Sequence, residues 1–486
     1  MKLSTCTKDY WDMNIIIMIP AYNEEKILPR TIETAHKQTL AAKGVFVIAN
    51  NCTDNTIKVC QELQKKYGED WLHIIEMPDN PNKKAGAMNK GFWLIMDLYP
   101  DTDLMLAVDG DSVLDENLIE VTAELFCINP QLGAVCTACR VLPLKDILEG
   151  EKPTWSQKLL HEIQVIEYTL AHANQLEDYE KARVLPGVAT TFRVETLHDV
   201  RQWNIENGFG DCIWRLKCLV EDYFLTIGTH ETTWQAKPSY EIISYADVPL
   251  SLAELWDQRL RWFRGTIDVL LERLLGEDLL KYVRSAIKLH LKKRSKLYSD
   301  VVEMFRIQLF RVKDRRLEWY EDRDILDTPK MPFNERWFQR YKNTINILRR
   351  FVTDKITRRE ILSIILLPYN LINILLIIGI FTYYPISNTP MPITPFLFLP
   401  LFMTIAPSMF TLLWKRKRLT LLQRIIILTM VIPIIYGIWK TFIYFRAIKL
   451  SLTEEDKEWK NPTATPSSKK HTNKIQKIKN KQKEAV

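Results

Sequence analysis

The first 125 residues alternate short apolar runs with longer amphipathic stretches. The apolar runs have the length of buried strands, and the stretches between them repeat their apolar positions at helical spacing. Strands that alternate with helices predict parallel βαβ units in a doubly wound α/β sheet. The expected strands are residues 14–19, 45–49, 73–76 and 104–108, and the expected helices are residues 24–38, 56–66 and 85–98.

Polar side chains follow three of these expected strands. They are the groups at residues 22–24, 50–54 and 109–111. The carboxyl ends of parallel strands meet at one edge of a sheet, so these loops should form a single site. Asp109 and Asp111 can offer hard oxygen ligands to Mg²⁺ or Mn²⁺. Asp, Asn and Thr also favour turns and helix starts, so simple turn and N-cap chemistry is the alternative at residues 22–24 and 50–54.

Residues 126–265 mix strands and helices less regularly. Residues 186–192 indicate a turn that leads into a strand, and Leu252–Leu275 indicates an amphipathic helix. On that helix Gln258, Arg261 and Trp262 are spaced i, i+3, i+4 and therefore share one face. A buried helix face with one salt bridge would have the same pattern. Cys136 and Cys139 lie in a strand-like run and are expected to be buried thiols, not metal ligands.

The chain resembles the family 2 glycosyltransferases, specifically the membrane-attached kind that includes polysaccharide synthases. The resemblance covers residues 14–265 and is carried by six short motifs in the family's order. They stand at residues 20–24, 50–56, 84–91, 109–111, 221–222 and 258–262.

The resemblance implies a GT-A fold, which is Rossmann-like with a mostly parallel sheet. It also implies a nucleotide-sugar donor, a divalent metal (Mg²⁺ or Mn²⁺) and inversion at the anomeric carbon. The family usually has Asp where this chain has Asn50, although an amide oxygen can still accept from uracil, and a UDP-sugar is the expected donor. The implied sites are catalytic Asp222 and Glu221; metal ligands Asp109 and Asp111; nucleotide contacts Ala21, Tyr22, Glu24, Asn50, Asp54 and Asp109; and substrate contacts Lys84, Gln258, Arg261 and Trp262.

The chemistry of these residue types agrees with the implied roles. Asp222 has apolar neighbours, which should raise its pKa and suit it to act as a general base. Lys84 and Arg261 can contact phosphate, and Trp262 offers a flat platform for an acceptor sugar ring. An ordinary surface lysine is the alternative for Lys84, and a carboxylate at a helix start is the alternative for Asp222.

Apolar residues are concentrated after residue 360. The stretches at 361–384, 392–413 and 422–445 are each long enough to cross a bilayer, which takes roughly 20 residues. The net charge of +7 comes largely from the C-terminal half and the tail. Because basic residues flank the apolar stretches, membrane lipids are favoured over nucleic acid as partners. The N-terminus has no signal-peptide pattern and the eight cysteines form no framework, so an integral membrane protein with a cytoplasmic catalytic domain is expected.

Four regions are therefore expected. Residues 1–265 form the GT-A domain and 266–360 a basic helical region, either interfacial or an ordinary solvated bundle face. Residues 361–447 form the transmembrane region with about three apolar segments, and 448–486 a cytoplasmic Lys-rich tail, largely disordered. Three crossings would place that tail outside, so the number of crossings stays open.

The acceptor is expected to be a polysaccharide or a lipid-linked sugar, with a partner membrane subunit as an open option. The leading hypothesis is processive extension of a polysaccharide. The alternatives are transfer of one sugar to a polyprenyl phosphate or lipid, and a membrane scaffold with an inactive transferase domain.

Overall fold

The computed structural model describes residues 9–176, 181–275 and 431–453, together with residues 280, 284, 420 and 423. The chain divides into two compact units. One comprises Met1–Gln258, Thr411–Thr429 and Lys460–Val486, and the other comprises Arg259–Phe410 and Met430–Trp459. The apolar stretches at 361–384 and 392–413, the basic stretch at 285–360 and the Lys-rich tail from 454 lie outside the described residues.

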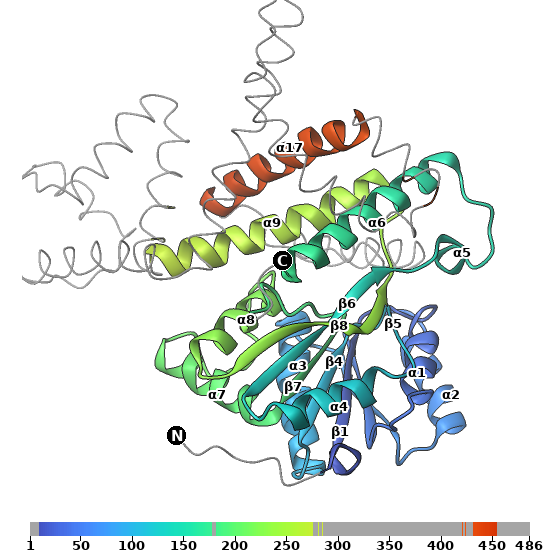
Figure 1. Ribbon diagram of the computed structural model, residues 1–486, viewed down its shortest axis with the longest axis vertical. Coiled ribbons are helices and arrows are strands. Elements are labelled where there is room, and N and C mark those ends of the chain that lie inside the picture. Colours follow the sequence, from blue (N-terminus) through green and yellow to red (C-terminus); the bar gives the residue numbers. More distant parts are fainter. Residues whose placement is uncertain are drawn as a thin grey trace, which may run out of the picture. The chain divides into compact units, whose positions relative to one another are not determined.

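The first unit is built on an eight-stranded sheet with the strand order β3-β2-β1-β4-β7-β6-β8-β5. Strands β1 and β4 to β8 of this sheet are labelled in Figure 1. The first four strands of the sheet pair in parallel, as the alternating pattern predicted. The strands are β1 (Ile15–Ala21), β2 (Gly44–Asn50), β3 (Leu72–Met77), β4 (Leu104–Val108), β5 (Ser112–Leu114), β6 (Leu132–Val141), β7 (Ala189–Arg193) and β8 (Gln235–Ala246).

The second half of the sheet contains two strands, β7 and β5, that run against the others, so the sheet is mixed but mostly parallel, as expected. Strand β7 inserts between β4 and β6 and runs antiparallel to both, and β5 runs antiparallel to β8. Only β6 and β8 are parallel in this half. Strands β6, β7 and β8 come from the region that lacks the regular alternation of strands and helices, so the βαβ pattern could not extend to them. The result is a mixed α/β sheet of the GT-A type.

Helices cover both faces of this sheet. Alternate residues of β1 divide between two cores: Ile15, Ile17 and Ile19 pack with α1, α2 and α4 on one face, and Ile16 and Met18 pack with α3, α7 and α8 on the other. Burial on both faces explains why the strands read as continuous apolar runs. The helices of this unit are η1 (Tyr10–Asp12), α1 (Leu28–His36), α2 (Thr56–Tyr67), α3 (Lys83–Leu98), α4 (Leu118–Ile128), α5 (Leu144–Ile147), α6 (Trp155–Leu176), α7 (Val194–Glu206) and α8 (Glu221–Glu231).

Helix α9 (Leu252–Leu275) begins in the first unit and continues into the second, and its bounds match the expected helix. In the second unit Ile267 of α9 packs against Tyr444 and Ala447 of α17 (Val431–Thr453). Arg284 joins this packing, because its guanidinium lies 2.7 Å from Asp268 Oδ1 and donates to the carbonyl of Ser451 at 2.8 Å.

The third apolar stretch, expected to cross a membrane at 422–445, is described as the helix α17 from Val431 onwards. The helix continues to Thr453 and carries Lys440, Arg446 and Lys449. Among the residues that the structure describes, no helix is long and apolar enough to span a bilayer.

Candidate active site

Lys84 is the point at which three distant motifs meet. Its Nζ lies 2.6 Å from Asp109 Oδ1 and 3.3 Å from Glu221 Oε1. Lys84 stands in the first turn of α3, Asp109 directly follows β4, and Glu221 opens α8. The structure therefore brings three of the predicted site residues together, and their roles in catalysis and binding stay predictions.

The Lys84 side chain is held as a cation by its surroundings. Burial alone would lower its pKa, but the carboxylates of Asp109, Glu221 and Asp222 outweigh burial and raise the pKa above that of an ordinary lysine. Lys84 thus offsets part of the negative charge that these three acids bring to one place. An ordinary surface lysine, the alternative from sequence, would not be paired in this way.

Asp222 faces the same pocket from the start of α8. Its Oδ1 accepts the backbone N–H of Tyr223 at 2.8 Å. The adjacent Glu221 is more deeply buried and pairs with Lys84. Residues from both halves of the sheet line the pocket, including Pro20, Lys84, Met88, Asp109, Gly187, Trp214, Glu221 and Asp222. The raised pKa expected for Asp222 stays a prediction.

Asp111 sits among acids on the other side of Asp109. Burial, the charge of Asp109 and the charge of Asp247 raise the pKa of Asp111 to about 7. Strands β5 and β8 pair antiparallel with Ser112 opposite Ala246, which brings the flanking Asp111 and Asp247 towards one another. Burial also raises the pKa of Asp247 to about 6. Asp247 was missed from sequence, because only the strand register brings it here.

The carboxylates of Asp109 and Asp111 are suited to a divalent cation. Among the described residues, no group of three or more His, Cys, Asp or Glu side chains is arranged to hold a metal ion. Mg²⁺ is usually bound by one or two carboxylates together with substrate phosphates, and two acidic side chains at the end of β4 match that donor set.

The loops at residues 22–25 and 51–56 are joined by hydrogen bonds. Asn23 Oδ1 accepts from the backbone N–H of Thr53 at 2.8 Å, and the backbone N–H of Glu24 donates to Thr56 Oγ1 at 2.9 Å. Asp54 accepts from the N–H of Thr56 at 3.0 Å and from its hydroxyl at 2.6 Å. Asp54 thus makes the bonds of a turn just before α2, as the turn alternative expects, and its contact with a nucleotide stays a prediction.

Asn50 already has a partner inside the protein. Its Oδ1 accepts from Asn80 Nδ2 at 2.7 Å, and the residue is only 5% exposed. Asn80 also exchanges two hydrogen bonds of 2.8 Å with Asn51, which has the left-handed φ of 55°. The oxygen that was expected to accept from uracil is therefore engaged. Asn80 was not singled out from sequence, since no spacing links it to Asn50. Nearby, Ala21 and Glu24 are buried and Tyr22 is half-buried at the end of β1.

The remaining predicted contacts lie along α9. Gln258 is buried and is the last residue of this segment of the first unit, whereas Arg261 and Trp262 belong to the second unit and are half-buried. Within the second unit the guanidinium of Arg259, which is 1% exposed, lies 4.3 Å from the ring centroid of Trp262. Trp262 therefore has a cation–π partner that the i, i+3, i+4 pattern did not include.

Gly187 borders the Lys84–Asp109 pair and was considered from sequence only as part of a turn. Its carbonyl accepts the backbone N–H of Asp109 at 3.0 Å, next to the last paired residues of β4 and β7. A Cβ at this position would lie 2.7 Å from Lys84 Nζ and 3.0 Å from both carboxylate oxygens of Asp109. The absence of a side chain at residue 187 therefore leaves the space that the ion pair occupies.

Comparison with known proteins defines the class to which this fold and site belong. Residues 13–265 match the family described as "Glycosyltransferase like family 2". The match covers more than half of the chain, and the chain therefore belongs to this glycosyltransferase family.

Individual proteins with similar sequences can also be named. The poly-beta-1,6-N-acetyl-D-glucosamine synthase of Staphylococcus epidermidis is 24% identical over 260 residues, covering 53% of this chain and 55% of that protein. The enzyme of the same name from Staphylococcus aureus (strain COL) is 24% identical over 268 residues, with the same coverage of both chains. The chain spans about half the length of the curated relatives that it matches.

Solved structures also align with the chain. The mannosyltransferase PcManGT from Pyrobaculum calidifontis, in complex with GDP-Man and Mn²⁺, is 15% identical with a TM-score of 0.38, covering 72% of this chain and 92% of that chain. Residues 1–349 of S. aureus TarS, in complex with UDP-GlcNAc, are 15% identical with a TM-score of 0.35, covering 64% and 79% of the two chains.

Proposed function

We propose that this chain transfers a sugar from a UDP-sugar to a growing polysaccharide, with inversion and formation of a β-glycosidic bond, at the cytoplasmic face of a membrane. The observation that carries the proposal is the meeting of Lys84, Asp109, Glu221 and Asp222 at one pocket. Membership of the family supports sugar transfer. The synthases among the relatives support a polysaccharide product and N-acetylglucosamine as the sugar.

The pocket supplies the groups that an inverting transfer needs. As the acceptor hydroxyl oxygen attacks the anomeric carbon, Asp222 takes its proton. The bond between the anomeric carbon and the diphosphate oxygen breaks on the opposite face, and its electron pair leaves with the nucleoside diphosphate. Lys84 offsets the charge of that leaving group, and Glu221 keeps Lys84 in place.

A divalent cation completes the proposed site. Asp109 and Asp111 would hold Mg²⁺ or Mn²⁺, which would neutralise charge on the departing diphosphate as a Lewis acid. Lys84 already touches Asp109 Oδ1, so it stands beside the position where phosphate and cation would meet.

The acceptor and the membrane complete the proposal. Arg261 is proposed to contact the leaving diphosphate, and Trp262 to carry an acceptor sugar, either the end of a polysaccharide or a lipid-linked sugar. Membrane attachment is supported by the apolar stretches at 361–384 and 392–413 and by the basic residues around them. A scaffold with an inactive transferase domain fits poorly, because the acid and lysine groups are all in place.

The proposed function predicts consumption of UDP-N-acetylglucosamine by membranes that contain the full chain. UDP-glucose and GDP-mannose serve as competing donors, and product length is read by size separation. A β-linked polymer is expected, and its formation should stop on chelation and return with Mg²⁺ or Mn²⁺. Transfer of only a single sugar would contradict the synthase hypothesis and favour the alternative of a lipid acceptor. Absence of transfer from every donor would contradict the function itself.

Gly187→Ala should impair transfer without unfolding the protein. The added methyl group would displace the end of Lys84, which is flexible, so the fold can adapt while the Lys84–Asp109 pair cannot keep its geometry. A misplacement of about 1 Å at a reacting site can lower a rate about 10²-fold, and we expect a loss of at least about tenfold. Gly44→Ala is the control, because its Cβ would make only ordinary contacts of 3.6 Å or more. Equal transfer rates for the two variants would contradict the prediction.

A further inference from the structure

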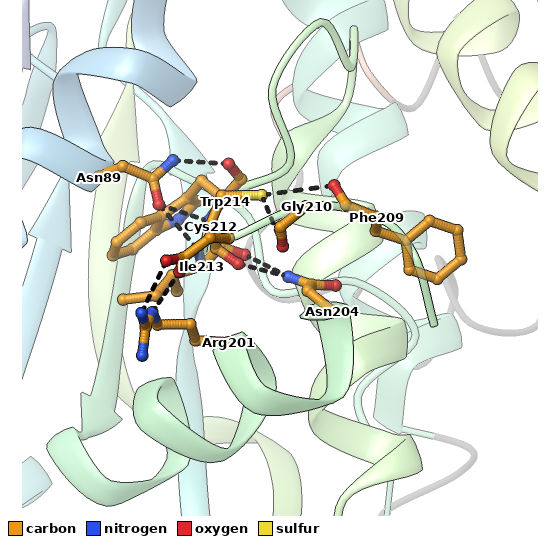
Figure 2. Close-up of polar contacts among 9 residues, drawn as sticks. Asn89, Arg201, Asn204, Phe209, Gly210, Cys212, Ile213 and Trp214 are labelled. Carbon is orange, nitrogen blue, oxygen red and sulfur yellow. Dashed lines mark hydrogen bonds and ion pairs between the residues drawn. The ribbon is translucent and has the colours of Figure 1, made fainter. Parts of the chain in front are cut away.

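The segment at residues 207–220 forms no helix or strand, yet it leads directly into Glu221 and Asp222. Backbone N–H and C=O groups need hydrogen-bond partners when they are removed from water. The middle of this segment is well buried, including Cys212, Ile213 and Trp214. Its backbone groups must therefore be satisfied from elsewhere, and Figure 2 shows that two asparagine side chains approach it.

Asn89 uses its whole amide group on this segment and its own helix. Its Oδ1 accepts from the N–H groups of Ile213 at 2.7 Å and Trp214 at 3.2 Å. Its Nδ2 donates to the carbonyl of Trp214 at 2.6 Å and to that of Ala85 at 2.7 Å. An amide side chain can make four hydrogen bonds, and Asn89 makes all four. The backbone of Trp214 is thereby attached to α3.

Asn204 holds the same stretch from α7. Its Nδ2 donates to the carbonyls of Cys212 at 2.8 Å and Ile213 at 3.1 Å, as drawn in Figure 2. Asn204 is fully buried, so these bonds are not exchanged easily for bonds to water. Three consecutive residues are thus fixed by amides from two different helices.

The fixed stretch forms a wall of the proposed active-site pocket. Trp214 is only 3% exposed and lines this pocket together with Lys84 and Asp222. Its indole also meets the ring of Phe92 edge to face, with 6.4 Å between centroids. Helix α3 therefore contributes Lys84 directly and holds the wall of the pocket through Asn89.

We propose that Asn89 is a positioning residue for sugar transfer, which sets the pocket wall at Trp214 and the path of the chain into Glu221 and Asp222. This inference rests on the proposed function and deepens it. Phosphate contacts made by Lys84 do not depend on the wall, whereas the orientation of the donor sugar towards Asp222 does. Loss of Asn89 should therefore lower kcat much more than it raises the KM for the donor.

The test compares Asn89→Ala and Asn89→Asp with the control Asn207→Ala in the full chain. Asn207 belongs to the same segment, but it is exposed and its Nδ2 donates only to Trp203 in the preceding helix. We expect Asn89→Ala to lower kcat by about 10-fold to 10²-fold, with donor KM changed by less than about threefold. Asn89→Asp keeps the two acceptor bonds but sets a carboxylate oxygen against the carbonyls of Trp214 and Ala85, so its loss of kcat should be at least as large as that of Asn89→Ala.

Hydrogen exchange of residues 207–220 and the melting temperature provide the second readout. Faster exchange with a lowered kcat in both Asn89 variants, and neither change in Asn207→Ala, would support the positioning role. Faster exchange with kcat equal to that of Asn207→Ala would overturn it, since Asn89 would then serve stability alone. If the unmodified chain transfers no sugar from any donor, the proposed function is wrong. If the unmodified chain is active and the Asn89 variants keep its rate, only the positioning role of Asn89 is wrong.

Discussion

Asp222→Asn is expected to lower the rate of sugar transfer by about 10²-fold to 10⁴-fold while leaving the fold intact. The amide has the shape of the carboxylate but cannot accept the proton of the acceptor hydroxyl. General base catalysis contributes about 10²-fold to 10⁴-fold, and a loss of that size is expected in kcat. The amide oxygen can still accept the N–H of Tyr223, a bond of 2.8 Å in the present structure, so the start of α8 should persist. The rate of transfer and the binding of UDP, measured by calorimetry, check both parts.

A matched control for this change is Asp211→Asn. Asp211 lies in the segment that precedes the same helix, but its side chain is 63% exposed and pairs with Arg201 at the surface. Exposed ion pairs contribute about 0.2–1 kcal/mol, so the control should retain its rate and nearly all its stability. Transfer by Asp222→Asn within tenfold of this control would contradict the assignment of the base.

The parallel half of the sheet was accessible from sequence because its strands are buried on both faces. A continuous apolar run such as Leu104–Val108 therefore predicts a buried strand clearly, and the observed strand β4 has the expected bounds. Strand β7 was foreseen only as a strand, and nothing in its residues indicates that it enters between β4 and β6 in the opposite direction. Direction depends on how the connections pack, which a local pattern does not report.

The residues of the candidate site also divide into those that sequence motifs identify and those that only the fold reveals. Lys84, Asp109 and Glu221 carry charges in recognisable motifs, but only the loop at Asp109 was placed at the sheet edge from sequence, and its ion pairing with Lys84 is seen in the fold. Gly187 matters because it has no side chain beside the Lys84–Asp109 pair, and Asn89 matters because it hydrogen-bonds to the backbone of another segment. Neither role can be predicted from the local sequence. Asn50 differs again: its residue type suggested a nucleotide contact, and its burial against Asn80 could be seen only in the fold.

The largest effect besides loss of the base is expected from Lys84→Met. The change removes the only cation shown within ion-pair distance of both Asp109 and Glu221 in the described part of the chain. Removal of one partner from a buried ion pair can destabilise a protein by about 3–5 kcal/mol, and partial exposure of Lys84 should reduce that figure. Transfer should fall at least about 10²-fold, because the leaving diphosphate also loses a counter-charge. Lys90→Met, at an exposed position of the same helix, is the control.

The pH dependence of stability distinguishes this electrostatic account of Lys84 from lost packing. The folded state raises the pKa of Lys84, so its stabilising effect is fully present below the ordinary lysine pKa and is lost only as pH rises through the higher folded value. In the variant the carboxylates repel each other without the charge of Lys84, which lowers the pKa of Asp111 in the unmodified chain. Asp111, whose pKa is already raised to about 7, therefore takes up a proton more readily as pH falls from 8 to 5, and this relieves the repulsion. The gap in melting temperature between the unmodified chain and Lys84→Met should therefore be smaller at pH 5 than at pH 8. A gap that is independent of pH would show that Lys84 stabilises the site through packing alone.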